Sequence, residues 1–223
     1  MIKLVVFLLF CLLLVYLIFK RTETYFFKYF MPVYVINLDH RTDRWSEAVT
    51  ELSPHFNLKR VSAVKQDPGW VGNGQSFKKI FKACDSDVLI FEDDATFKGT
   101  FSDLVKCIAD LPDGWDMLML GATIRDPKID RVSPNIVRTY GAWTSHAIIY
   151  SHRFAKEMAE TELTMPIDEY FRIVVHPKGN SYVCVPFLSY QRKSHSDIEH
   201  DIKDYTDLMD ESNRKVLEVV ANA

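Results

Sequence analysis

The stretch Asp87-Val88-Leu89-Ile90-Phe91-Glu92-Asp93-Asp94-Ala95 decides the fold. Its four consecutive apolar residues are typical of a buried strand in a parallel sheet, which reads as a continuous hydrophobic run. Three carboxylates follow the run directly, and ligands of open α/β sheets bind beyond the carboxyl ends of the strands. The stretch therefore predicts an α/β protein with an acidic site at the end of this strand.

A divalent cation would hold three adjacent acids together at neutral pH. The segment that follows, Ala95 to Lys98, supplies no evident neutralising partner. Hard oxygen ligands favour Mg²⁺ or Mn²⁺, which often keep waters and take phosphate oxygens as further ligands. Because side chains alternate along a strand, Glu92 and Asp94 should share one side and Asp93 the other, so at most two would contact the metal. The alternative is a solvated acidic turn after an edge strand.

The amino terminus predicts a membrane anchor. Leu4 to Phe19 holds 16 uncharged residues, and Lys20 and Arg21 follow. As a helix this segment spans about 24 Å at ~1.5 Å per residue, somewhat short of the ~27 Å core of an endoplasmic-reticulum bilayer. No small-residue cleavage site follows, which favours an uncleaved signal anchor. The alternative is a buried apolar helix of the domain.

We therefore expect an anchor at 1–21, an aromatic-basic juxtamembrane segment at 22–31 and one domain at 32–223. Positive charges nearly balance across the anchor, so the orientation stays open between the lumen of the secretory pathway (ER or Golgi) and the cytoplasmic membrane face. The chain is 48% hydrophobic, which is enough to bury a full core. Its formal net charge of -3 gives no reason to expect nucleic acid as a partner.

Strand and helix patterns alternate through the domain. Strands are predicted at 33–37, 60–64, 88–91, 117–121, 146–150 and 182–185, and helices after 42, 76, 100 and 151. This alternation predicts a mostly parallel sheet with right-handed crossovers. Thr42 or Asp43 is the expected N-cap of the first helix. Gly69 to Ser76, with three glycines, is interpreted as a loop that approaches a ligand or simply turns.

The first strand, its polar turn and the following helix form a natural anion site. Arg41 and Arg44 add positive charge there, which makes this turn a candidate phosphate site. Exposed arginines on a surface helix are the alternative.

Five segments, in order, resemble glycosyltransferase family 25, which holds lipooligosaccharide and collagen galactosyltransferases. They are Val35–Arg44 (the family's INL-x-x-R-x-x-R opening), Gly72–Ser76, Leu89–Ala95 (its LEDD metal motif), Trp115–Gly121 (WDxxxLG), and Ser194–Ile198 with Gln191 upstream. Together they cover roughly Pro32 to Ile198. Two positions depart from the family pattern: Asn73 replaces a cysteine, and Phe77 replaces a histidine.

The resemblance implies a Rossmann-like GT-A fold and an inverting, Mn²⁺- or Mg²⁺-dependent transfer of a hexose, galactose or a relative, from a UDP-sugar. The acceptor would be a glycan, a lipid-linked sugar or a hydroxylated protein, as in lipopolysaccharide or glycoprotein biosynthesis. The residues carried over as donor-binding are Asn37, Leu38, Arg41, Arg44 and Ser76, and those carried over as metal-binding are Glu92, Asp93, Asp94, His195 and Asp197. His195 and Asp197 have the alternative of a solvated loop.

Inverting transfer needs a carboxylate that takes the proton of the acceptor hydroxyl. Asp168 is the first candidate and Glu169 the second, because both stand out from the apolar, proline-containing context of Met165–Tyr170. A helix N-cap is the alternative role for Asp168.

Two other functions compete with the transferase. A catalytically inert membrane-bound relative would bind a sugar nucleotide or a protein partner without turnover, and Phe77 favours it. A metal phosphohydrolase also places aspartate after a strand, but an isolated nucleophilic aspartate with a downstream lysine and a second acidic strand is not evident.

Overall fold

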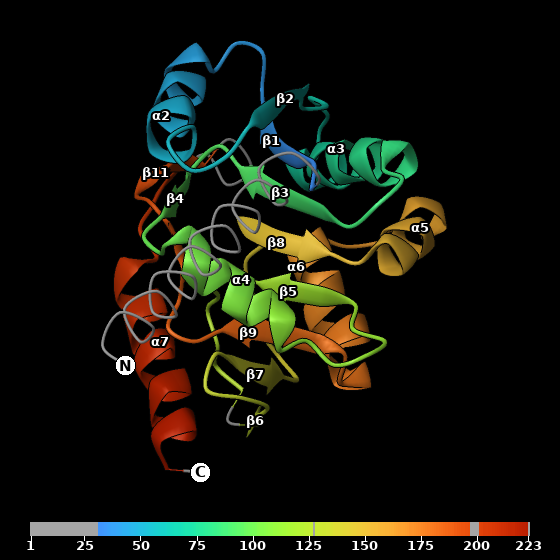
Figure 1. Cartoon of the computed structure of the whole chain (residues 1–223). Coiled ribbons are helices and arrows are strands. Elements are labelled where there is room, and N and C mark those ends of the chain that lie inside the picture. The colour runs from blue at the N-terminus through green and yellow to red at the C-terminus, as the bar shows by residue number, and fades with distance from the viewer. Residues whose placement is uncertain (1–30, 127, 197–200, 223) are drawn as a thin grey trace, which may run out of the picture.

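The computed structural model describes residues 31–126, 128–196 and 201–222 (Figure 1). The predicted anchor, and the juxtamembrane segment except Met31, lie outside the described residues. Within the described part of the chain, no helix combines the length and the apolar character needed to cross a membrane.

An eight-stranded sheet forms the centre of the domain, in the order β2-β1-β3-β8-β5-β9-β7-β6. Its strands are β1 (Val33–Asn37), β2 (Leu58–Ser62), β3 (Val88–Glu92), β5 (Met117–Met119), β6 (Ile129–Arg131), β7 (Ile136–Thr139), β8 (Ala147–Tyr150) and β9 (Ser181–Cys184). The predicted α/β architecture is confirmed.

The sheet is mixed but mostly parallel, as predicted, and two of its strands run in the opposite direction. β1 pairs in parallel with both β2 and β3, and β5 pairs in parallel with β9. β8 is antiparallel to both of its neighbours, β3 and β5, and β7 is antiparallel to β6 and β9. Six of the eight strands thus share one direction, and the reversal of β8 changes which loops meet at each edge of the sheet.

The central strand β3 sends alternate side chains into two cores. Val88 and Ile90 belong to the core on one face, whereas Leu89 and Phe91 belong to the core on the other. All four are fully buried, and burying such a side chain stabilises a fold by about 1.5–3 kcal/mol. The continuous apolar run therefore reflects a strand covered on both faces.

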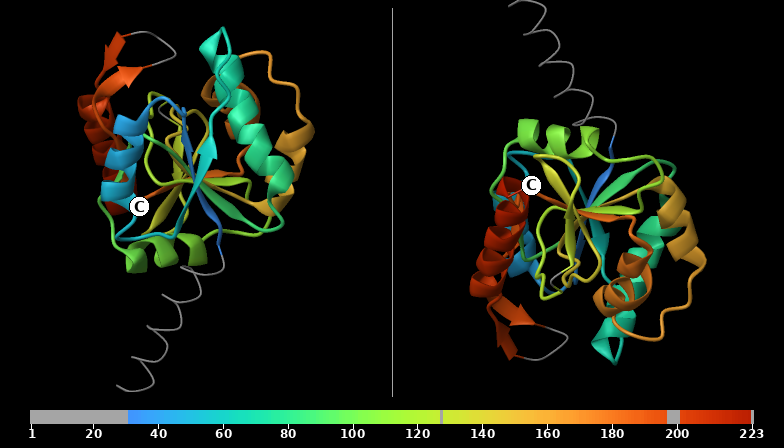
Figure 2. Two further views of the ribbon diagram at one scale, coloured as in Figure 1. Left: turned by 90° about the horizontal axis from the view of Figure 1, so that it is seen from above. Right: turned by 90° about the horizontal axis from the view of Figure 1, so that it is seen from below.

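Helices cover both faces of the sheet (Figure 2). The core that contains Leu89 is closed by α2 (Thr42–Leu52) and α4 (Phe101–Ala109). The opposite core is closed by α3 (Gly69–Ala83), α5 (His152–Glu160), the short α6 (Ile167–Tyr170) and the following η1 (Phe171–Val175), and it also takes residues of α7 (Thr206–Ala221). The turn η2 (His176–Lys178) follows η1 directly.

Two predicted helix starts are confirmed by their caps. Thr100 and Asp103 form a reciprocal capping box at α4, and the Ser151 side chain accepts a hydrogen bond from the Phe154 amide at α5. The first helix differs from expectation, since its N-cap is Arg41, which makes no side-chain cap bond.

The glycine-rich segment is helical, which corrects its interpretation as a loop. α3 begins at Gly69 and contains all three glycines of the segment. A Cβ at Gly72 would lie 2.2 Å from the Val64 carbonyl oxygen, and one at Gly74 would lie 2.8 Å from the Leu163 side chain. These glycines therefore allow close packing of the helix.

Two small antiparallel pairs lie beyond the edge of the main sheet. β4 (Ala95–Phe97) pairs with β10 (Ser189–Gln191), and β11 (Ser194–Ser196) pairs with β12 (Asp201–Lys203). The first pair places Gln191 opposite Ala95, directly after the acidic residues. The carboxyl-terminal part of the chain is thereby joined to the end of β3.

Candidate active site

A cavity of about 1050 Å³ opens beyond the carboxyl ends of β1 and β3. Of the residues singled out in the sequence, those that line it are Asn37, Leu38, Arg44, Ser76, Glu92, Asp93, Asp94, Asp168 and Glu169. Arg41 is not among its lining residues; it forms an ion pair with Asp43 at 3.0 Å. Asp197 and the side chain of His195 lie outside what the structure describes.

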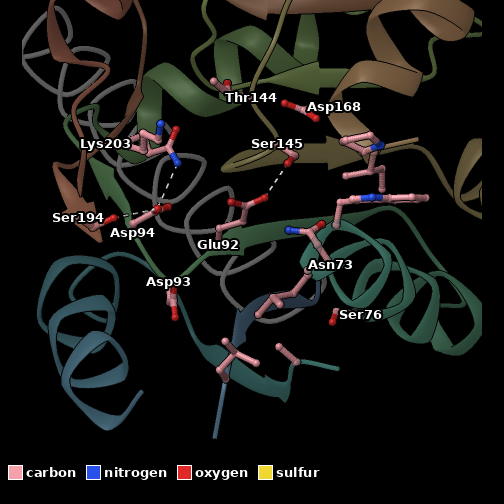
Figure 3. Close-up of a pocket in the computed structure, with 18 of the residues that line it drawn as sticks. Asn73, Ser76, Glu92, Asp93, Asp94, Thr144, Ser145, Asp168, Ser194 and Lys203 are labelled. Carbon is pink, nitrogen blue, oxygen red and sulfur yellow. Dashed lines mark hydrogen bonds between the residues drawn. The ribbon is translucent and has the colours of Figure 1, made fainter. Parts of the chain in front are cut away.

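The three acids at the carboxyl end of β3 point to two different sides, as the strand alternation predicts (Figure 3). Asp93 faces α2 and is tied to the protein: its Oδ1 lies 2.5 Å from the Arg44 guanidinium, and its Oδ2 accepts a hydrogen bond of 2.6 Å from Asn37 Nδ2. Burial still raises its pKa to about 6, against the lowering effect of Arg44.

Arg44 is the neutralising partner that the local sequence did not reveal. It is buried on α2, 49 residues before Asp93 in the chain by their numbers, and its guanidinium also lies 2.9 Å from Asp94 Oδ2. A charged pair buried in this way holds α2 against the end of β3. Whether Arg44 also contacts a diphosphate remains a prediction.

Asp94 combines a well-held oxygen with one that lacks a partner. Its Oδ2 accepts hydrogen bonds from Gln191 Nε2 at 3.1 Å and Ser194 Oγ at 3.3 Å, in addition to the Arg44 contact. Its Oδ1 is buried and has no hydrogen-bond partner among the described residues. A buried carboxylate oxygen without a partner is costly, so it suits a bound cation or donor group.

Glu92 lies on the Asp94 side of the strand. Its Oε1 accepts a hydrogen bond of 2.6 Å from Ser145 Oγ (Figure 3). Burial, followed by the charge of Asp94, raises the pKa of Glu92 to about 8, and the charge of Asp168 adds to this. Glu92 therefore holds a proton at neutral pH until a cation or another positive group joins the site. Such perturbed acids cluster at functional sites.

The two candidate bases differ in their partners. The Glu169 carboxylate accepts hydrogen bonds from Trp143 Nε1 at 3.1 Å and Arg172 Nε at 2.8 Å, and Arg172 holds its pKa below the usual range. Asp168 Oδ1 accepts from the Glu169 amide at 2.9 Å. The N-cap of α6 is Pro166, so Asp168 does not have the N-cap role. Glu169 is thus fixed as a structural anion, and Asp168 is the better candidate.

The donor-side residues have internal partners as well. The Ser76 hydroxyl donates to the Gly72 carbonyl at 2.7 Å and accepts from the Val64 amide at 2.8 Å. Asn37 donates to Asp93, and its Oδ1 accepts from Arg60 at 2.7 Å. Both side chains shape the wall of the cavity; a direct contact with a nucleotide stays a prediction.

The cavity offers two carboxylates, Asp94 and Glu92, as ligands for a divalent cation. Within the described residues, no group of three or more His, Cys, Asp or Glu side chains is placed to hold a metal ion. Mg²⁺ is commonly held by only one or two carboxylates together with substrate phosphates. Asp94 Oδ1 and, once deprotonated, Glu92 provide such a pair.

The two departures from the family pattern lie in different surroundings. Phe77 is fully buried, packs against Phe81 and Tyr150 at ring-centroid distances of 6.1 and 6.3 Å, and is not among the cavity-lining residues. Asn73 lines the cavity, and its buried Oδ1 has no hydrogen-bond partner among the described residues. The asparagine is therefore placed to contact a ligand, whereas the phenylalanine serves the core.

Trp143, Thr144 and Ser145 line the cavity and were missed as site residues, and the adjacent His146 supports them. Thr144 adopts φ 81, a left-handed conformation that is strained for a β-branched residue and typical of functional sites. His146 contacts Thr144 Oγ1 through Nδ1 at 3.1 Å, and burial lowers its pKa to about 4. The available sequence signal was that these residues directly precede the strand β8 (Ala147–Tyr150). The start of β8 lies at the same edge as the end of β3 because β8 runs antiparallel to β3.

Comparisons with known proteins give distant structural resemblances. No protein-family model and no curated protein matches the chain. Among solved structures, HddC from Yersinia pseudotuberculosis is similar with a TM-score of 0.38 and 14% identity over 74% of each chain. A mannose-1-phosphate geranyltransferase from Thermus thermophilus has a TM-score of 0.33 and 10% identity over 68% of this chain and 58% of its own. Similarity this low carries no information about the activity of this chain.

Proposed function

We propose that this protein is a GT-A-type glycosyltransferase that moves a hexose from a UDP-sugar to an acceptor hydroxyl with inversion. The observation that carries the proposal is the cavity beyond β3, where Asp94 Oδ1, which has no hydrogen-bond partner among the described residues, lies on the same side of the strand as the Glu92 carboxyl. The resemblance of five segments to family 25, in the family's order, implies galactose or a related hexose as the sugar. The predicted anchor would place this reaction at a membrane.

Asp94 and Glu92 would hold Mn²⁺ or Mg²⁺, with His195 and Asp197 as further candidate ligands. When bound, the ion supplies positive charge that offsets the charge developing on the departing diphosphate. Arg44 holds Asp94 in place, and Ser145 orients Glu92. These contacts preorganise the two carboxylates before any ligand arrives.

Asp168 takes the acceptor proton in this proposal. The acceptor oxygen forms a new bond to the sugar's anomeric carbon, the bond from that carbon to the diphosphate oxygen breaks, and UDP leaves with its electron pair. The hydroxyl proton passes to the Asp168 carboxylate. Glu169 stays bound to Trp143 and Arg172 throughout and fixes the turn of α6 that carries Asp168.

Donor turnover and donor binding test the proposal separately. UDP-galactose hydrolysis by the full-length chain should require Mn²⁺, and isothermal titration should detect UDP binding that is stronger with the ion. UDP binding without any turnover would favour the inert relative. Absence of both binding and turnover, with UDP-galactose and other UDP-hexoses alike, would contradict the proposed function.

A further inference from the structure

A second hollow of about 470 Å³ adjoins the main cavity and has no role in the reaction as described so far. Both are lined by Arg125 and Trp143. Arg172 lies on the wall of the second hollow, and its partner Glu169 directly follows the proposed base Asp168. The second hollow therefore adjoins the reacting end of the cavity, with Arg125 and Trp143 at the boundary between them.

Two guanidinium groups pack on the Trp143 ring in this hollow. The guanidinium carbons of Arg172 and Arg125 lie 4.8 and 5.6 Å from the ring centroid. Such packing holds arginine side chains in place while leaving their N–H edges available to an anion. The cations are thus positioned before a ligand arrives.

The charges of the two arginines are balanced differently. Arg172 is paired with Glu169, whereas no carboxylate of the described residues forms an ion pair with Arg125, whose side chain is exposed. Asp126 also lines the hollow, but its Oδ1 accepts a hydrogen bond from the Lys128 amide at 2.8 Å. A hydrogen bond from Lys215 and, to a smaller extent, the charge of Arg125 lower the pKa of Glu211, but the ion pair of Glu211 is with Lys215 at 2.9 Å. Arg125 consequently offers a positive charge at the junction of the two spaces.

We infer that this hollow binds the part of the acceptor beyond the reacting hydroxyl, and that it selects a saccharide carrying an anionic group, a carboxylate or a phosphate. The inference rests on the proposed function, because it assigns the Asp168 side of the cavity to the acceptor. In inverting displacement the acceptor approaches opposite the departing diphosphate. With the diphosphate near Asp94, the acceptor comes from the side of Asp168, Trp143 and Arg125.

Saturation-transfer NMR on the full-length chain, without donor, tests this inference with three probes: glucuronic acid, glucose 6-phosphate and neutral glucose. Anionic sugars should bind at least about tenfold more tightly than glucose, the value of one charge-assisted hydrogen bond. A preference for glucuronic acid identifies a carboxylate as the recognised group, and a preference for the phosphate identifies a phosphorylated sugar.

Arg125→Gln should remove this preference, lowering the affinity for the anionic probe by about tenfold or more. The matched control is Arg131→Gln, which deletes the same charge at an exposed position outside both spaces and should bind as the wild type does. Thermal melts establish that both variants are folded.

Two results would overturn the inference: equal binding of charged and neutral sugars, or anionic-sugar affinity that is unchanged in Arg125→Gln. Isothermal titration of wild-type protein with UDP and Mn²⁺ separates it from the proposed function. A chain that binds UDP but no anionic sugar refutes this inference alone, whereas a chain that neither binds UDP nor turns over UDP-hexoses refutes the proposed function whichever sugar binds.

Discussion

The two edges of the central sheet differ in whether their polar side chains are paired within the protein or face a cavity. At the edge where β3 begins, Asp87 accepts a hydrogen bond from the His152 amide at 2.8 Å, and the buried Asp116 pairs with Arg153. At the edge where β3 ends, the buried Asp94 Oδ1, Asn73 Oδ1 and Thr123 Oγ1 have no hydrogen-bond partner among the described residues, and all three belong to cavity-lining residues.

This difference separates groups that stabilise the fold from groups that a ligand would complete. Among the described residues, buried polar atoms without a hydrogen-bond partner also occur at the edge where β3 begins, at Tyr150 Oη, His152 Nε2 and Ser181 Oγ, but none of these residues lines the cavity. Each such atom costs roughly 1–3 kcal/mol, and those at the cavity are the ones that an entering ligand can complete. The same chemistry, an aspartate next to a strand end, is thus structural at one edge and, we propose, functional at the other.

Among the substitutions at the cavity, Asp168→Asn should produce a large loss of turnover. Removing a general base lowers turnover by about 10²–10⁴-fold, while UDP affinity and the melting temperature stay near wild type. Initial rates of galactose transfer, UDP titration and thermal melts measure the three quantities. A variant that transfers sugar at the wild-type rate would exclude Asp168 as the base.

Without divalent ions, the free energy of unfolding should decrease as pH rises, because of Glu92 at the end of β3. The pKa of Glu92 is about 8 in the folded protein, against 4.5 for an ordinary glutamate, so the folded state binds more protons between these values. Stability then falls as pH rises through this window, by up to a few kcal/mol.

Glu92→Gln keeps a side chain that can bond to Ser145 but cannot ionise. Urea unfolding at pH 5 and pH 8, without divalent ions, should show a flatter pH dependence for this variant than for the wild type. If both proteins lose stability equally over this range, the burial of Glu92 is not the source of the pH dependence.

Asp116→Asn tests the opposite edge and should have the smallest effect of the three. Asp116 is 3% exposed, but its partner Arg153 is more than half exposed, so we expect a loss of about 1–2 kcal/mol in urea unfolding. Turnover per folded molecule should stay at the wild-type level. A large loss of turnover with unchanged stability would reverse the assignment of the two edges.

Local sequence patterns predicted the features that depend only on neighbouring residues. The apolar run 88–91, the capping box at Thr100 and the cap at Ser151 predicted β3 and the starts of α4 and α5, because each depends on neighbouring residues. Alternation along β3 likewise separated Asp93 from Glu92 and Asp94.

Long-range pairing limited the rest. Strand direction is set by contacts across the sheet, so the reversal of β8, and with it the placement of Trp143 to Ser145 at the cavity, was not predicted. Arg44 meets Asp93 and Asp94 only after β1, β3 and α2 have packed together. The helical Gly72 depends on its close approach to Val64, a contact that composition does not reveal.

The most direct test of the account is UDP-galactose hydrolysis as a function of Mn²⁺ concentration for wild type and Asp94→Asn, with thermal melts alongside. We predict that the variant requires far more Mn²⁺ and turns over about 10²-fold or more slowly, as is typical when charge stabilisation of a leaving group is lost. It should fold no less stably, because Asp93 still pairs with Arg44 and one buried charge is removed. Superimposable Mn²⁺ curves for the two proteins would contradict the metal site, and with it the proposed transferase.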